Sequence, residues 1–166
     1  TREVMEDKVP QPRIYRVWNV AEVGNPDLDR LQLLAQVLGG SRSSRLDARL
    51  LHRDQLVDSI SAGAYGKQLG SNFMVIANVK QGVDPAKVEA AIGEAVAKFL
   101  AEGPTEEELS RYKATAYAAN VRSLERVGGK PSRLAESLVY LGSADGWKRD
   151  FEWYQSASAA DVQAAA

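Results

Sequence analysis

The sequence contains no cysteine and only one histidine, His52, among its 166 residues. Without cysteine the chain can form neither a disulfide framework nor a thiolate metal site. A histidine-based zinc site takes three or four ligands, so one histidine without cysteine does not supply a usual site. Because His52 falls near a helix end rich in Leu, Arg and Asp, we expect it to lie on the surface. We therefore predict no catalytic, cofactor-binding or metal-binding residue in this chain.

The sequence also lacks a charge excess and a long hydrophobic run. It carries 21 basic and 22 acidic residues, for a net charge of -1. This balance argues against nucleic acid as the main partner. No stretch is long and apolar enough to predict a membrane span, and the polar segment 1–10 does not resemble a signal peptide. Hydrophobic residues make up 45% of the chain and charged residues 26%, which is typical of a folded globular domain.

Two catalytic or binding motifs are missing as well. No G-x-S-x-G sequence is present to place a serine nucleophile. The glycine-rich segment 39–44 follows a predicted helix and lacks the Gly-Lys-Ser/Thr ending of a phosphate-binding loop, so we interpret it as a helix stop followed by a helix start. Anion binding at that new helix start is left open.

The hydrophobic pattern predicts three strands and several helices. Residues 13–20 form a strand with apolar side chains on both faces, which predicts a central position. Residues 57–65 and 72–80 form two more strands, and the link between them carries two glycines, as a hairpin does. Helices begin after the capping residues Asn25, Asp84 and Thr105. The remaining predicted helical segments span residues 41–53, 132–141, 146–155 and 158–165.

These elements predict an α+β fold, with an at least partly antiparallel sheet and helices packed on one face. Charged stripes follow the helices: residues 106–108 place acid in a first turn, and two basic sets are expected to be solvated faces. The basic sets are Arg42, Arg45 and Arg49, and Arg122 and Arg126. The aromatic residues Trp147, Phe151, Trp153 and Tyr154 are expected to be core or a cover over the sheet, with an interface to another domain as the alternative.

The order and spacing of several motifs give a resemblance that covers nearly the whole chain from residue 13. The motifs are LLAQVLGG at 33–40, SSRL at 43–46, DQL at 54–56 leading into SISA at 59–62, GVDPAKVE at 82–89, EGPTEEEL at 102–109 and AADV at 159–162. Together they resemble the second, non-catalytic domain of one half of an insulinase/pitrilysin-like zinc metallopeptidase, an inverzincin.

The resemblance implies a larger architecture. Members of this family have two halves of two α+β domains each, which close around a chamber that holds the peptide. Zinc is bound in the first domain by two histidines of H-x-x-E-H and a distant glutamate, so zinc is expected in the parent protein and not in this chain. The expected partners are other domains of the parent chain and a peptide substrate, and a homo- or heterodimer is left open.

One feature departs from the family pattern. In the C-terminal half of active members, an arginine and a tyrosine seven residues later hold substrate near the zinc. Those positions fall on Leu51 and Asp58 here, and the nearby Arg49, Arg53 and Tyr65 have the wrong spacing. The substrate-binding role is therefore transferred to no residue.

We predict that residues 1–166 form a single domain cut from a longer chain, which builds the chamber wall and helps to position peptide. The alternative is a non-proteolytic scaffold or partner subunit derived from the same family, as in the core subunits of respiratory complexes. An unrelated α+β enzyme for a small ligand is disfavoured, because no convergent set of polar residues can be placed in a pocket. The residues do not fix the compartment, and the family resemblance implies a periplasmic or membrane-associated bacterial protein.

Overall fold

The computed structural model describes residues 1–166, apart from the side chain of Asp150. Three strands and seven helical elements follow one another along the chain. They are β1 (Arg13–Val20), α1 (Pro26–Gly39), η1 (Asp47–Arg53), β2 (Val57–Tyr65), β3 (Ser71–Val79), α2 (Pro85–Glu102), α3 (Glu106–Glu125), α4 (Gly129–Leu141), α5 (Gly146–Ser156) and α6 (Ala159–Ala164).

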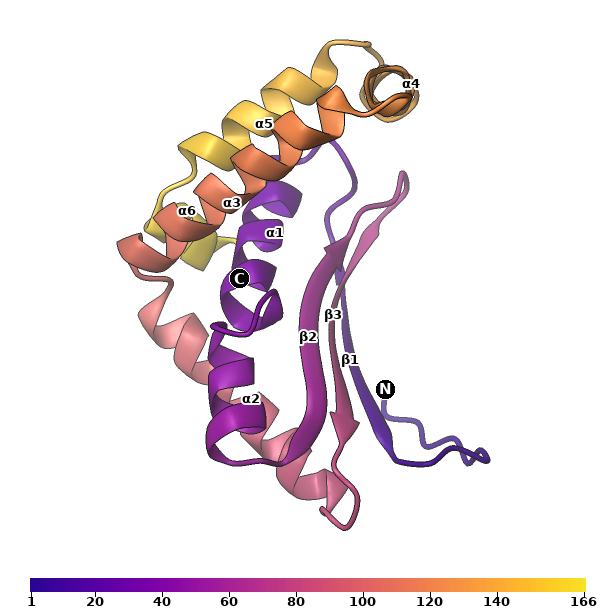
Figure 1. The fold of residues 1–166 in the computed structure, drawn as a ribbon, viewed down its shortest axis with the longest axis vertical. Coiled ribbons are helices and arrows are strands. Elements are labelled where there is room, and N and C mark those ends of the chain that lie inside the picture. The colour runs from indigo at the N-terminus through magenta and orange to yellow at the C-terminus, as the bar shows by residue number, and fades with distance from the viewer.

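The strands form an antiparallel sheet in the order β1-β3-β2. Helices α1 and α2 lie on one face of this sheet, as Figure 1 shows. On β3 the residues facing these helices are buried, and the alternate residues are half-buried. The predicted α+β fold with an antiparallel sheet and helices on one face is therefore confirmed.

The prediction that β1 is a central strand is wrong, because β1 lies at the edge and β3 lies between its two neighbours. The apolar side chains on both faces of β1 have a different cause. Ile14 and Trp18 face the helices, whereas Tyr15 and Val17 lie on the open face of the sheet and are 56% and 51% exposed. Apolar residues on an exposed sheet face give the same sequence pattern as a strand covered on both sides.

The helix boundaries follow the capping signals of the sequence. Asn25 accepts a hydrogen bond from the backbone N–H of Asp27 at 3.0 Å, and a proline stands in the first turn of α1. The same arrangement opens α2 at Asp84, and a capping box of Thr105 and Glu108 opens α3. Segment 41–53 is less regular than predicted, and its continuous part is the π-helix η1.

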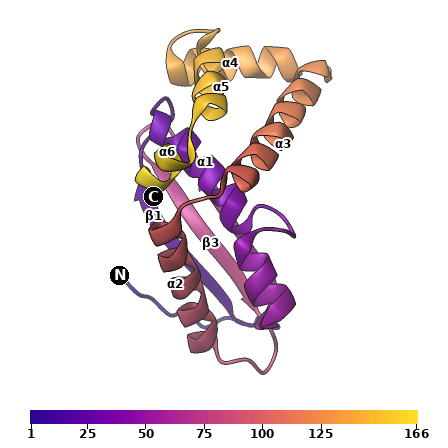
Figure 2. The ribbon, with the colours of Figure 1, turned by 90° about the vertical axis from the view of Figure 1, so that its left-hand side faces the viewer.

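The core lies between α1, α2 and the covered face of the sheet. Its fully buried residues include members of α1, α2, β2 and β3, and the apolar residues of β1 that pack against it are partly buried. Helices α3, α5 and α6 then pack on α1. Figure 2 shows that α3 diverges from α1, that α4 crosses the open end, and that α5 runs back toward α1. Among the described residues, no helix combines the length and the apolarity needed to cross a bilayer.

Candidate functional site

The polar residues considered first in the sequence do not converge on a reactive centre. His52 lies exposed near the end of η1, as predicted. Leu51 is half-buried and Asp58 is exposed on β2. Among the described side chains, no group of three or more His, Asp or Glu residues is placed to hold a metal ion. The donor groups of the described residues therefore do not fit a zinc ion, and no step through a metal is assigned to them.

The glycine-rich segment 39–44 has its hydroxyl groups engaged inside the protein. Ser44 is buried, and its Oγ donates a hydrogen bond to Oδ2 of Asp47 at 2.7 Å. The Oγ of Ser41 shares a hydrogen bond of 3.1 Å with the hydroxyl of Tyr112. A carboxylate thus already occupies the start of the helical segment, which argues against the anion site that the sequence left open.

The prediction that Arg42, Arg45 and Arg49 form a solvated stripe is wrong for two of the three. Arg42 is exposed, but Arg45 and Arg49 are half-buried and take part in ion pairs. Arg49 pairs with Glu94 of α2 and, at 3.4 Å, with Asp54. By contrast, Arg122 and Arg126 are exposed, as predicted.

Arg45 connects the start of η1 to the junction between α2 and α3. Its Nε and Nη2 donate to the two carboxylate oxygens of Glu108 at 2.9 and 2.7 Å, and Nη2 also donates to the carbonyl of Gly103 at 2.9 Å. The hydrogen bond from Arg45 holds the pKa of Glu108 below its ordinary value, although partial burial acts in the opposite direction. The acidic first turn of α3 therefore stabilises more than its own helix.

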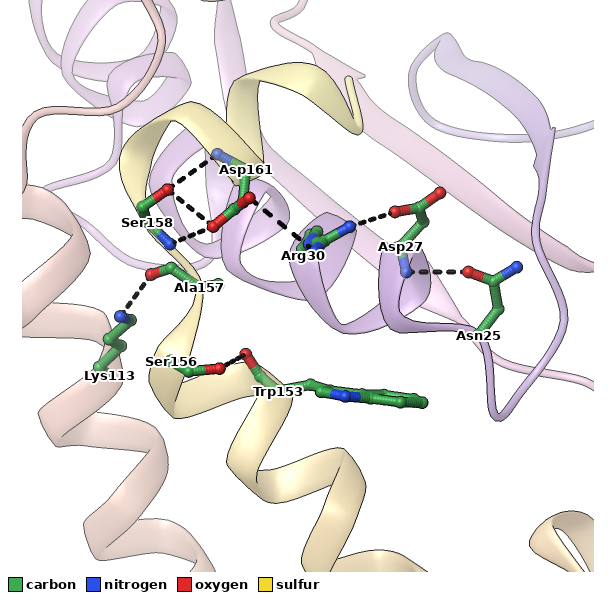
Figure 3. A network of polar contacts seen from close by, with 9 residues as sticks. All are labelled: Asn25, Asp27, Arg30, Lys113, Trp153, Ser156, Ala157, Ser158 and Asp161. Carbon is green, nitrogen blue, oxygen red and sulfur yellow. Dashed lines mark hydrogen bonds and ion pairs between the residues drawn. The ribbon is translucent and has the colours of Figure 1, made fainter.

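A second polar network joins the connection between α5 and α6 to α1 and α3 (Figure 3). Ser158 and Asp161 form a capping box, and Arg30 of α1 lies 3.9 Å from Asp161 and 2.7 Å from Asp27. Lys113 of α3 donates to the carbonyl of Ala157. Burial lowers the pKa of Lys113, whereas the nearby carboxylates raise it. The network fixes the end of α5 against α1 and α3.

Helix α5 carries the aromatic cluster of the sequence. Tyr154 is buried, and Trp147, Phe151 and Trp153 are half-buried. The prediction of core residues is confirmed for Tyr154, which belongs to the hydrophobic core, whereas the prediction of a cover over the sheet is wrong, because α5 packs on α1 and α4. Burial, reinforced by the charge of Asp29, raises the pKa of Tyr154 to about 12, so this phenol stays protonated at neutral pH.

A cleft of about 650 Å³ is lined by residues of α1, β2, α3, α4 and α5. Its floor and walls come from five elements, and its lining combines alanine methyl groups, aromatic rings, amides and hydroxyls with one acidic and one basic side chain. The lining residues are Asp29, Gln32, Ala35, Gln36, Gly63, Ala64, Tyr65, Tyr112, Thr115, Ala116, Ala119, Asn120, Ser123, Arg133, Phe151 and Tyr154. This mixture suits a ligand with both apolar and hydrogen-bonding groups.

The cleft lies beside the end of an edge strand. Among the described residues, β2 has a strand partner on one side only, because β3 is its single neighbour in the sheet. An edge strand presents unpaired backbone N–H and C=O groups, and such a row can pair with another extended chain. Gly63, Ala64 and Tyr65 bring this part of β2 to the cleft. The unpaired backbone edge of β2 and the lining of the cleft thus lie next to each other.

The sequence did not predict this cleft. Its residues are spread from position 29 to position 154, and its volume depends on the angle at which α3 leaves α2. The sequence does contain one weak signal of the cleft. Ala116 and Ala119 give α3 small side chains, whereas a helix face packed against a neighbour commonly carries larger ones. Sequence spacing alone does not reveal which face of α3 those residues line.

Comparisons with known proteins identify the relationship that this geometry leaves open. Residues 1–116 match the family described as "Peptidase M16 inactive domain". No curated protein matches the sequence.

Solved structures match the whole fold. A protease from Helicobacter pylori is similar with a TM-score of 0.89 and 21% identity, over 98% of this chain and 39% of that one. The inactive peptidase domain of a zinc-protease candidate from Bordetella parapertussis has a TM-score of 0.86 and 19% identity, over 97% of this chain and 85% of that one. A chain of complex III2 from Candida albicans has a TM-score of 0.78 and 17% identity, over 96% and 40%.

At these identities the solved structures show a shared fold. The chain spans less than half the length of the Helicobacter pylori protease and of the complex III2 chain. The family match is independent of them and covers more than half of the sequence. This chain therefore belongs to the peptidase M16 inactive domain family, within the insulinase/pitrilysin group.

Proposed function

We propose that this chain is one domain of a longer zinc metallopeptidase, in which it forms part of the chamber wall and holds peptide substrate in an extended conformation. Membership of the inactive domain family supports the absence of a catalytic role for these residues. The similarity to a Helicobacter pylori protease, of which this chain covers 39%, supports a longer parent chain. Zinc would be held elsewhere in that parent, where it would activate water and polarise the peptide carbonyl.

The observation that carries the positioning role is the unpaired edge of β2 next to the cleft. A peptide added along β2 would gain main-chain hydrogen bonds from the strand, and its alternate side chains would point to opposite faces of the sheet. Where the peptide runs beside residues 63–65, its side chains on the helix-covered face would then enter the cleft. The main-chain bonds depend little on the peptide sequence, which suits a protein that handles varied peptides.

The alternative is a non-proteolytic scaffold or partner subunit. The likeness to a chain of complex III2 from Candida albicans is the observation in its favour. The two functions differ in one measurable property, since a scaffold requires no affinity for extended peptides at the β2 edge. Peptide binding to this chain therefore decides between them.

Filling the cleft tests the proposal. Ala119 is an exposed residue of α3 that lines the cleft. We expect Ala119→Trp to weaken the binding of extended decapeptides at least about fivefold, because the indole would occupy the space of an entering side chain, at a cost of 1 kcal/mol or more. Fluorescence anisotropy with labelled peptides measures the dissociation constant.

Ala114→Trp is the matched control, because Ala114 is also an exposed alanine of α3 but lines a separate, smaller hollow. We expect this variant to bind peptides like the unchanged chain. Equal affinities for the Ala119→Trp variant and its control would place any bound peptide outside the cleft and would refute the proposed site. Peptides that fail to bind the unchanged chain would favour the scaffold function.

A further inference from the structure

Arg133 is the only basic residue among the side chains that line the cleft. It belongs to α4, which crosses the open end of the space between α1 and α3. Among the described side chains, no carboxylate forms an ion pair with the guanidinium group of Arg133. Its Nε is buried without a hydrogen-bond acceptor. A half-buried cation without an acidic partner costs free energy, unless a ligand supplies the charge.

A second buried donor lies next to this guanidinium group. The Arg133 guanidinium stacks over the ring of Trp147 at 5.7 Å from its centroid. The indole Nε1 of Trp147 is also buried without an acceptor. Buried donors are nearly always paired in folded proteins, so these two leave hydrogen-bonding capacity unused at the α4 wall.

The acidic residue of the cleft belongs to another wall. Asp29 lies on α1, where its charge acts on Tyr154 of α5, and it has contacts of its own. Among the described side chains of the cleft, none forms an ion pair with Arg133. An entering carboxylate would meet the guanidinium without having to displace a partner among the described side chains.

We propose that Arg133 makes the cleft selective for a peptide that carries a carboxylate, supplied either by an acidic side chain or by a free C-terminus. The inference rests on the proposed function, because the peptide first has to lie along β2. Arginine binds a carboxylate through two parallel, charge-assisted hydrogen bonds, which is the geometry that its free guanidinium edge offers. The domain thereby contributes selectivity for acidic segments in addition to a sequence-tolerant main-chain contact.

A set of labelled peptides tests this with the 166-residue chain itself. One glutamate is moved along a neutral decapeptide with an amidated end, each member has a glutamine counterpart, and one neutral peptide keeps its free C-terminal carboxylate. We expect at least one carboxylate peptide to bind about tenfold more tightly than its neutral counterpart, as one charge-assisted hydrogen bond predicts. The peptide that shows the preference identifies the source of the carboxylate.

Arg133→Gln should abolish this preference, so that each carboxylate peptide then binds like its neutral counterpart. Arg122→Gln is the control, because Arg122 is exposed on α3 and does not line the cleft, and it should keep the preference. Equal affinities for charged and neutral peptides, or a preference that survives Arg133→Gln, would overturn the inference while the proposed function stands. If neither kind of peptide binds, both are overturned. The comparison of peptides needs no variant, so it remains decisive if Arg133→Gln unfolds.

Discussion

Glu108→Ala is expected to lower the free energy of unfolding by about 3 kcal/mol, because it breaks a half-buried ion pair and a helix cap together. The side chains of Arg45 and Glu108 are only 21% and 20% exposed. Without Glu108, the guanidinium of Arg45 would keep the Gly103 carbonyl and a carboxylate oxygen of Glu102 at 4.0 Å. The backbone N–H of Thr105, which donates to Glu108 at 2.8 Å, would also lose its acceptor.

Urea unfolding followed by circular dichroism measures this loss. Glu107→Ala is the matched control, since Glu107 is an exposed neighbour in the same first turn of α3. Its removal should cost no more than about 0.5 kcal/mol, as for a surface charge near a helix start. A loss that is equally small for Glu108→Ala would show that the ion pair does not hold η1 to the α2–α3 junction.

The same pair gives stability a dependence on pH. The pKa of Glu108 is lower in the folded chain than its ordinary value, mainly because Arg45 donates to the carboxylate. The unfolded chain therefore takes up the proton first as pH falls, and the contribution of Glu108 is complete only above the ordinary pKa of a glutamate. We expect the stability difference between the unchanged chain and Glu108→Ala to shrink as acid drives the pH below that range.

Gly39→Ala is expected to destabilise the fold by about 1–3 kcal/mol, which is the usual cost of overpacking. A Cβ on Gly39 would lie 2.6 Å from the backbone nitrogen of Ala62 and 3.0 Å from the carbonyl carbon of Ser61. These are backbone atoms of β2, so they cannot rotate away as a side chain does. Helix α1 would have to move off the strand, and the cleft wall that it forms would move with it.

Gly93→Ala provides the opposite expectation in the middle of α2. A Cβ there would meet only the Nη1 of Arg16, at 3.3 Å, which is the end of a flexible side chain. Alanine is a better helix former than glycine, so this variant should gain about 0.5–1 kcal/mol. Thermal unfolding of both variants makes the comparison. A Gly39→Ala variant as stable as Gly93→Ala would contradict the close contact between α1 and β2.

Local sequence signals were sufficient for most of the secondary structure. The starts of α1, α2 and α3 were predictable because each depends on a capping side chain within three residues and, for α1 and α2, on a following proline. The role of Gly39 was only partly predictable. Gly39 is the last residue of α1, as the sequence predicted. The neighbouring Gly40 has an ordinary negative φ of -89°, so the helix end itself does not require a glycine there. Position 39 requires a glycine because β2, more than twenty residues later in the chain, lies too close for a Cβ.

The features that depend on distant residues were not predictable in the same way. The arginine spacing of 42, 45 and 49 is that of a solvated helix face, and nothing local indicates that Glu108 neutralises Arg45 across 63 positions. The cleft is likewise a product of helix directions, because α3 departs from α1 and α4 crosses the gap. The family resemblance predicted the type of domain correctly, but no motif in it pointed to Arg133.

Hydrogen exchange of the backbone amides reports directly which edge of the sheet binds the peptide. The chain is compared with and without a saturating extended peptide. An added strand would form hydrogen bonds with the outward-facing amides of β2, so we expect slower exchange within residues 61–65 and unchanged exchange within β1. Slower exchange in β1, or an unchanged exchange rate in β2 while the peptide is bound, would contradict peptide binding at the β2 edge.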